Sequence, residues 1–262
     1  MSKSLKVMLI IGAVLIGIGI IVVLAVGFSS GWQFSTANAE YKTYETEVGA
    51  EITDIDLDFS AGTLKVEFYD GDVIKVEYPE TKQITTECKV TGKTLKIKSI
   101  VHWHVQFWGF NKIPPTRIYI PQNTVLGLKM DVSAGSISFG AGAFSDVDIK
   151  ISAGAITMGS VKCDDFNLKM SAGAVDVSQI QCNRFKADLS AGALNVKGLN
   201  CDNIGLDVSA GAADLSIAGK KSDYTIQTDV SAGSCNVRSQ SGGSKRLTVD
   251  VSAGSVDVSF EG

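Results

Sequence analysis

The chain has 262 residues, of which 45% are hydrophobic and 20% are charged, and its formal net charge is −4 at pH 7. This length and aliphatic content allow a sizeable buried core and exclude intrinsic disorder. A mildly acidic chain lacks the basic surface of a nucleic-acid-binding protein, so we expect no nucleic-acid partner. His102 and His104 are the only histidines, which leaves few candidates for histidine-dependent catalysis.

A charge-free apolar segment runs from Val7 to Phe28, after the cations Lys3 and Lys6. As a helix rising about 1.5 Å per residue, a segment of this length spans the ~30 Å hydrocarbon core of a bilayer. The next cation is Lys42, so the positive-inside rule places the N-terminus in the cytoplasm and the remainder outside it. The sequence therefore predicts one transmembrane helix.

A cleaved signal peptide is the alternative, because Ala37-Asn38-Ala39 fits the A-x-A cleavage pattern. However, the apolar run is longer than a usual signal-peptide core of about 7–15 residues. We therefore expect residues 1–28 to be the cytoplasmic N-terminus and transmembrane helix of a single-pass cell-membrane protein, and residues 29–43 to be a tether. Both interpretations place the C-terminal domain outside the cytoplasm.

Residues 44–127 form a less regular section, in which the first Ser-Ala-Gly motif begins at Ser60. Turn residues follow at Asp70-Gly71-Asp72 and at Thr91-Gly92-Lys93, and both predict hairpins. The stretch TRIYIP then leads into a regular array. Because a solenoid needs an atypical end to cover its first rung, we expect this irregular, hairpin-rich section to be an N-terminal cap.

The segment HWHVQFWGF, His102 to Phe110, interrupts the pattern of this section. Strand alternation would place its two histidines on one face and aromatic side chains on the other. The aromatic residues either cover the open first rung or form an interaction surface for a ligand, a partner or the membrane interface. They are Trp103, Phe107, Trp108 and Phe110. Two histidines alone rarely hold a metal, so no metal site is expected.

A repeat dominates residues 128–262, where Ser-Ala-Gly recurs at four steps of 19 residues, then at steps of 22 and 21. The seven motifs begin at Ser133, Ser152, Ser171, Ser190, Ser209, Ser231 and Ser252. Apolar residues stand five, three and one positions before the Ser, with polar residues between them, which predicts a half-buried strand. Apolar residues four and six positions after the Ser predict a second strand with shifted parity, so the chain turns a corner within the motif.

Two strands in each repeat of about 19 residues predict an all-β chain, a parallel β-solenoid whose seven regular rungs stack about 4.8 Å apart. The motif glycine is the natural residue for an unusual backbone conformation at the corner. We also expect the Ser hydroxyls to form a hydrogen-bonded column. The corner glycines are Gly62, Gly135, Gly154, Gly173, Gly192, Gly211, Gly233 and Gly254.

Cys163, Cys182 and Cys201 also recur at steps of 19 residues, so they share one ladder, with Phe144 one rung earlier. This spacing is not that of a Cys-x-x-Cys metal site. The five cysteines are an odd number, and in-register strands aim neighbouring Cβ atoms the same way. A buried thiol column, one disulfide and a metal site stay open as alternatives.

Four successive motifs carry an Asp two residues before the Ser, which predicts an outward acidic column. These residues are Asp188, Asp207, Asp229 and Asp250. Stacked carboxylates repel one another, and a hard cation such as Ca²⁺ would relieve this repulsion. The compact Gly- and Asp-rich loops of Ca²⁺-binding β-rolls are absent. A solvated surface and weak cation binding are the two interpretations.

The repeated Ser residues do not indicate an enzyme. A nucleophile needs a base within hydrogen-bond reach, and eight equivalent serines cannot share two histidines. We therefore expect no catalytic residue and no cofactor.

The stretches IDLDFSAGTLKVEF, GKTLKIKS and TRIYIPQN, followed by the strand–SAG–strand units, resemble the DUF4097 family over residues 44–262. Proteins of this bacterial envelope family are often labelled adhesins. The resemblance implies an extracytoplasmic β-solenoid behind one N-terminal membrane segment, and it supplies no catalytic motif. Some members resemble accessory proteins of Gram-positive envelope-stress systems.

These observations predict a membrane-anchored, non-enzymatic adhesin-like or envelope scaffold module with a protein or cell-wall partner. The alternative is a regulator of an envelope-stress response that acts through a membrane partner. The final rung, Leu247 to Val258, has no cap after it in the sequence. Because an open rung presents unpaired backbone groups, we expect this rung to dock onto another molecule, including end-to-end self-association.

Overall fold

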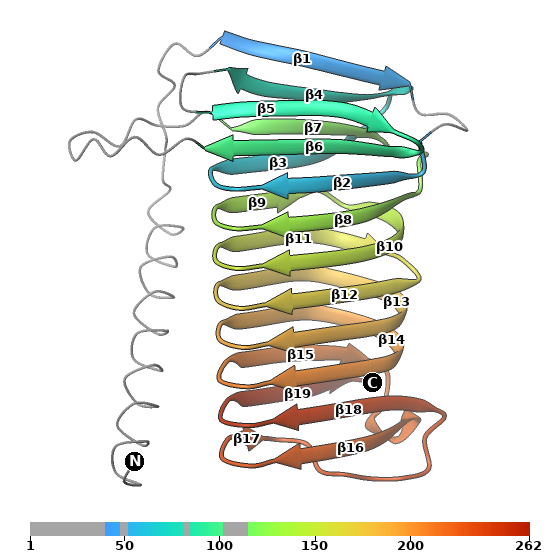
Figure 1. Ribbon diagram of the computed structural model, residues 1–262. Helices are drawn as coiled ribbons and strands as arrows, with labels where there is room; N and C mark the ends of the chain where they lie inside the picture. Colours follow the sequence, from blue (N-terminus) through green and yellow to red (C-terminus); the bar gives the residue numbers. More distant parts are fainter. Residues whose placement is uncertain (1–39, 48–51, 81–83, 102–114) are drawn as a thin grey trace, which may run out of the picture.

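The computed structural model describes residues 40–47, 52–80, 84–101 and 115–262 (Figure 1). These residues are all-β apart from one 3₁₀ turn, η1 (Lys221–Asp223). No helix within the described ranges is long and apolar enough to cross a bilayer. The predicted transmembrane helix, Val7 to Phe28, lies outside these residues and stays a prediction.

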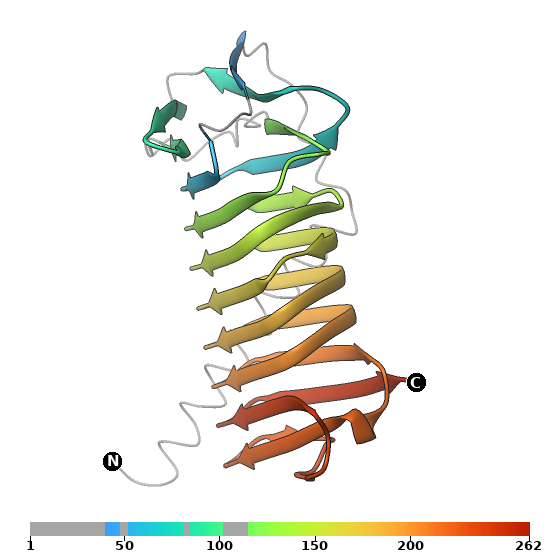
Figure 2. The same ribbon diagram turned by 90° about the vertical axis from the view of Figure 1, so that its right-hand side faces the viewer.

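The strands stack along one axis in two facing sheets, which Figure 2 shows from the side. Face A contains the strands that precede each Ser-Ala-Gly motif, and face B contains those that follow it. In stacking order, face A is β5 (Ile84–Thr91), β6 (Thr94–Val101), β2 (Asp54–Phe59), β8 (Leu126–Val132), β10 (Gly142–Ile151), β12 (Asp165–Met170), the second halves of β13 (Ala174–Leu189) and β14 (Ala193–Val208), β18 (Lys245–Val251) and β16 (Tyr224–Val230).

Face B contains the remaining strands, with the same stacking direction. Its order is β1 (Glu40–Glu47), β4 (Val73–Glu80), β7 (Thr116–Pro121), β3 (Thr63–Tyr69), β9 (Ser136–Phe139), β11 (Ala155–Lys162), the first halves of β13 and β14, β15 (Ala212–Ala218), β19 (Ser255–Glu261) and β17 (Ser234–Cys235). From β3 to β17 every pair is parallel, and the register of the repeat is kept except for one shift between β14 and β15, after Val196.

The core lies between the two faces and follows the predicted alternation. On β12 the apolar side chains of Phe166, Leu168 and Met170 are buried, and the residues between them are more exposed. The rings of Phe166 and Phe185, on adjacent rungs, stack with centroids 5.6 Å apart. In-register stacking thus places equivalent apolar side chains on top of one another and removes them from water.

The last two rungs are stacked in an order that differs from their order in the sequence. The rung of Ser252, β18 and β19, lies between the rung of Ser209 and the rung of Ser231 (Figure 1). The prediction that the C-terminal rung ends the stack is therefore wrong. The outermost rung is β16 and β17, and the chain returns from it to insert its last two strands.

The longer steps of 22 and 21 residues provide the length that this arrangement needs. Skipping one rung adds about 4.8 Å to the path, and an extended residue spans about 3.3–3.6 Å, so one or two extra residues are enough. The crossing from β15 to β16 uses η1, where the Lys220 N–H donates to Asp223 Oδ2 at 3.0 Å. The insertion near Lys220 thus carries the chain past the inserted rung, and the longer connection near Gly242 returns the chain to that rung.

The outer edge of β16 is covered by the connection that returns to β18. The N–H of Ile226 donates to the Gln240 carbonyl at 2.8 Å, and the Gln240 N–H donates back at 2.9 Å. The N–H of Thr228 donates to Ser239 Oγ at 3.0 Å. The rung expected to be open, Leu247 to Val258, is therefore an inner rung, and the connection covers part of the outer edge of β16. Self-association itself stays a prediction.

At the N-terminal end, too, the first motif strand lies inside the stack and is covered by other strands. The first motif strand, β2, lies between β6 and β8, so β6 and β7 cover the rung of Ser60 from outside. The turn at 91–93 joins β5 and β6 as the predicted hairpin. The turn at 70–72 does not form a hairpin, because β7 lies between β3 and β4. The expected tether, residues 29–43, overlaps β1, which begins at Glu40.

Candidate interaction surface

The Ser-Ala-Gly corners stack into one continuous edge of the solenoid. Backbone groups of adjacent corners pair directly: the Ala153 N–H donates to the Ser133 carbonyl at 3.0 Å, and the Ala155 N–H donates to the Gly135 carbonyl at 2.8 Å. The same bonds recur at each later corner up to Ser255, which donates to Gly211. The corner therefore continues the backbone ladder from face A to face B without interruption.

The close approach of these corners explains the glycines. A Cβ on Gly154 would lie 2.5 Å from the Gly135 carbonyl oxygen, and one on Gly211 would lie 2.7 Å from the Gly192 oxygen. Real Cβ atoms do not approach a backbone oxygen this closely, so a larger residue forces the rungs apart. The same obstruction is found at Gly135, Gly173, Gly192, Gly233 and Gly254.

The expected backbone conformation holds for only part of the glycine column. Gly211, Gly233 and Gly254, in the last three motifs, do not have a positive φ, so glycine is required there for space alone. The other five do, with φ between 115° and 139°, a region that favours glycine. They are Gly62, Gly135, Gly154, Gly173 and Gly192.

The predicted column of hydrogen-bonded Ser hydroxyls is wrong. The seven serines from Ser133 to Ser252 are exposed, and within the described residues no hydrogen bond joins their hydroxyls. Their N–H and carbonyl groups already bond to the neighbouring corners, so the fold does not need the side chains. The corner presents a regular polar edge to the solvent.

The acidic column on face A is in register across four adjacent strands. In stacking order its residues are Asp188, Asp207, Asp250 and Asp229. Asp250 comes before Asp229 because the inserted strand β18 lies between β14 and β16. Of these four, within the part of the chain that the structure describes, only Asp188 has an ion pair, with Lys186 at 3.4 Å. Neighbouring carboxylates on adjacent strands destabilise a sheet, so this column opposes folding.

The matching column on face B contains amides among its carboxylates. Its residues in stacking order are Asp176, Asn195, Asp214, Asp257 and Asn236. Asn195 Nδ2 donates to Asp176 Oδ1 at 3.0 Å, and Asn236 Nδ2 donates to Asp257 Oδ1. Amides thus bond to two of the three aspartates on face B, whereas the column on face A contains no amide.

The column on face A also changes charge along the axis. The same position is Lys150 on β10 and Lys169 on β12, and Lys169 stands directly opposite Asp188 of the next rung. A fold that accepts Lys and Asp at one position does not dictate either. The run of four aspartates is therefore a property of the surface and not a requirement of the stack.

Trp103, Phe107, Trp108 and Phe110 lie outside the described residues. Two shallow hollows, of about 410 and 360 Å³, lie beside Phe68 and beside Asp54. No group of three potential metal ligands occurs among the residues that the structure describes.

The family model of the Toastrack domain DUF4097 matches residues 52–262. Among solved structures, the chain is similar to a candidate adhesin from Bacteroides fragilis (14% identity, 84% of this chain and 97% of that chain, TM-score 0.46). It is similar to a candidate cell adhesion protein from Clostridium sporogenes (14%, 85% and 100%, TM-score 0.28) and to a candidate lipid-binding protein from Parabacteroides distasonis (18%, 84% and 97%, TM-score 0.35). A comparison with curated proteins gave no match.

Proposed function

Because the chain belongs to the Toastrack DUF4097 family, as its motifs predicted, we propose that it is a non-enzymatic interaction module of the cell envelope. In this proposal residues 1–28 anchor the chain in the membrane, and the solenoid presents an adhesin-like surface outside the cytoplasm. The surface is the acidic column of face A, formed by Asp188, Asp207, Asp250 and Asp229. Its partner carries positive charge.

One observation supports this choice of surface. Three of the four aspartates have no ion pair within the described residues, although equivalent positions carry Lys on β10 and β12. An unrelieved column costs stability, and a cationic partner would recover that stability on binding. The four carboxylates stand about 4.8 Å apart on a flat, exposed sheet face, which suits an extended cationic segment laid along the axis.

Site-specific photo-crosslinking of the full-length chain in intact cells tests the proposal. A photo-reactive residue at position 227 reports on the acidic end of face A, and the matched control at position 167 occupies the same column of the sheet farther from that end. We expect an adduct from position 227 that the double variant Asp207→Asn/Asp250→Asn removes. The double variant Lys150→Gln/Lys169→Gln should leave it unchanged.

Two outcomes would contradict the proposal: equal adducts from positions 227 and 167, or an adduct that survives neutralisation of the aspartates. The chemistry of the adduct separates the two functions left open by the sequence. A cell-wall or surface component indicates adhesion or scaffolding, and an integral membrane protein indicates envelope-stress regulation.

A further inference from the structure

The corner opposite the Ser-Ala-Gly edge contains the cysteine ladder that the repeat predicts. Cys182 on β13 and Cys201 on β14 are direct partners in the sheet. Cys163 precedes β12 one rung earlier, where its N–H donates to the Gln181 carbonyl at 3.0 Å. All three side chains are buried, with exposed fractions of 7% for Cys163, 8% for Cys182 and 1% for Cys201.

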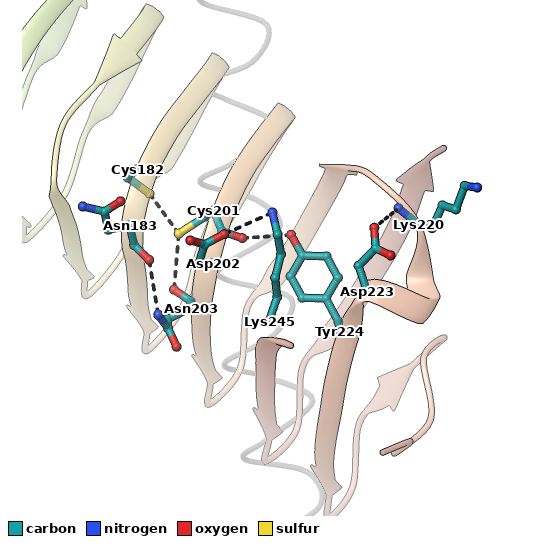
Figure 3. A network of polar contacts seen from close by, with 9 residues as sticks. All are labelled: Cys182, Asn183, Cys201, Asp202, Asn203, Lys220, Asp223, Tyr224 and Lys245. Atoms are coloured by element: carbon teal, nitrogen blue, oxygen red, sulfur yellow. Dashed lines mark hydrogen bonds and ion pairs between the residues drawn. The ribbon is translucent and has the colours of Figure 1, made fainter. Parts of the chain in front are cut away.

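Two of these sulfurs are already close together. Cys182 Sγ lies 3.1 Å from Cys201 Sγ, while both residues are free thiols (Figure 3). A disulfide has an S–S length of about 2.05 Å, so the two sulfurs need to move by only about 1 Å. We propose that Cys182 and Cys201 are a redox-active dithiol that a hydroperoxide oxidises to a disulfide across two adjacent rungs.

The surroundings give the two thiols different roles. The hydrogen bond from Cys182 lowers the pKa of the Cys201 thiol. Contacts with Cys163 and Cys201, together with burial, raise the pKa of Cys182. Cys201 therefore loses its proton more readily than Cys182 and is the thiol that reacts first, while Cys182 holds the proton that the second step needs.

The reaction proceeds in two balanced steps. The Cys201 thiolate attacks one oxygen of the hydroperoxide, the O–O bond breaks, and a sulfenic acid forms while the other oxygen leaves and takes up a proton. Cys182 Sγ then attacks Cys201 Sγ, the S–O bond breaks, and the hydroxyl leaves with the Cys182 proton as water. With hydrogen peroxide, two thiols and one peroxide give one disulfide and two waters, and the sulfurs lose two electrons.

Sheet geometry makes this disulfide easy to reduce. In-register parallel strands aim the two Cβ atoms the same way, whereas a relaxed disulfide needs them about 3.8 Å apart and turned toward each other. A strained disulfide has a more oxidising potential than a structural one. The pair is thus reversible and differs from a permanent crosslink between rungs.

The pair lies beside the point at which the stacking order of the rungs first differs from their order in the sequence. The Tyr224 hydroxyl, on the outermost rung, donates to the Cys201 carbonyl at 2.8 Å (Figure 3). Lys245 of the inserted strand contacts Asp202 at 3.1 Å. Oxidation at Cys201 therefore acts on the backbone that contacts the outermost rung through Tyr224 and the inserted strand through Lys245.

Peptide mapping of the full-length chain tests the proposal, because trypsin places each of the five cysteines on a separate peptide. The reduced, folded chain is treated with hydrogen peroxide, and the remaining thiols are alkylated after denaturation. We expect loss of two alkylated thiols and one linked pair of peptides, 170–184 with 198–220. Reduced glutathione added after oxidation should remove the link. Cys88, whose pKa burial raises to about 12, serves as the unreactive internal control.

Two variants show which thiols react. Cys163→Ser should keep the 182–201 link at the wild-type yield, and Cys201→Ser should abolish every link. A 163–182 link in Cys201→Ser would overturn the pairing. In the wild-type chain, which needs no substitution to fold, peroxide treatment that yields no linked peptides, or only sulfinic acid on Cys201, would overturn the proposal.

Discussion

The middle rungs and the two C-terminal rungs share one sequence pattern but are assembled differently. In the middle, β13 pairs with β14 at a separation of 19 residues, so each rung is held by its neighbours in sequence. At the C-terminus, β18 lies between β14 and β16 and pairs with both. A rung at the end of a simple stack can fray alone, whereas this chain holds its last strands between two others.

The N-terminal end repeats this solution with different strands. There β2, the first motif strand, is enclosed by β6 and β8, and antiparallel strands continue outward. At the N-terminal end strands of the irregular section take the outermost positions, whereas at the C-terminal end the outermost rung, β16 and β17, carries a Ser-Ala-Gly motif of its own. The comparison teaches that the ends are protected by rung order as well as by added residues.

Deleting residues 245–262 should have the largest effect, because it removes an inner rung. Without β18, the only backbone pairing that β16 keeps among the described residues is its antiparallel bridge to Gln240, and an isolated strand pair is not stable in water. Hydrogen exchange should show loss of amide protection in β16 by a factor on the order of 100 or more, with β8 and β12 unchanged. Retained protection of β16 would show that the outer rung does not depend on the inserted one.

Corner glycines separate the effect of space from that of backbone conformation. An added Cβ would lie 2.6 Å from a backbone oxygen at Gly192 and 2.7 Å at Gly211, but only Gly192 has a positive φ, +139°. Gly192→Ala should therefore cost about 1–3 kcal/mol more than Gly211→Ala. Denaturant unfolding of the two variants measures the difference, and equal costs would show that φ is unimportant at the corner.

Tyr224 connects the outermost rung to the middle and provides a pH test. Burial raises the pKa of its hydroxyl to about 12, from an ordinary value of 10.0. The folded state thus holds this proton more tightly, so stability is full below pH 10 and falls as pH rises toward 12. Tyr224→Phe should lose about 1 kcal/mol at neutral pH and show a shallower decline above pH 10. Parallel pH profiles for the two proteins would contradict this role.

The acidic column should give the smallest change. Asp207→Asn removes repulsion with Asp188 and Asp250, so it should stabilise the chain by about 0.2–1 kcal/mol at low salt and by less at high salt. The matched control on face B is Asn195→Asp, which replaces a donor to Asp176 by a charge and should destabilise by a similar amount. Thermal unfolding at two salt concentrations measures both, and destabilisation by Asp207→Asn would show that the column does not oppose folding.

The two-strand repeat was predictable because its apolar positions follow period two and its parity changes at the motif. The order of the last rungs was not. The apolar positions of β18, such as Leu247, match those of β16, such as Ile226, so the apolar pattern alone does not indicate which strand lies against β14. Only the longer steps around Lys220 and Gly242 distinguish them, and these insertions were interpreted as small additions to the standard repeat.

The candidate surface was predictable to a similar extent. The glycine positions follow from the motif, and stacking explains them at all described corners beyond the first. The Ser hydroxyl column was wrong because the backbone ladder needs no side chain there. Tyr224 was missed, since a single aromatic residue before a strand does not reveal that its hydroxyl reaches Cys201.

The order of the last rungs can be measured directly with cysteine pairs on face A, in a chain whose five native cysteines are replaced by Ala. Asp207 is the direct partner of Asp250, which is in turn the partner of Asp229. A short bis-alkylating thiol reagent, which spans neighbouring strands about 4.8 Å apart but not strands about 9.6 Å apart, should therefore link Asp207→Cys to Asp250→Cys and leave Asp207→Cys and Asp229→Cys unlinked. A link between positions 207 and 229, with none between 207 and 250, would contradict the inserted rung.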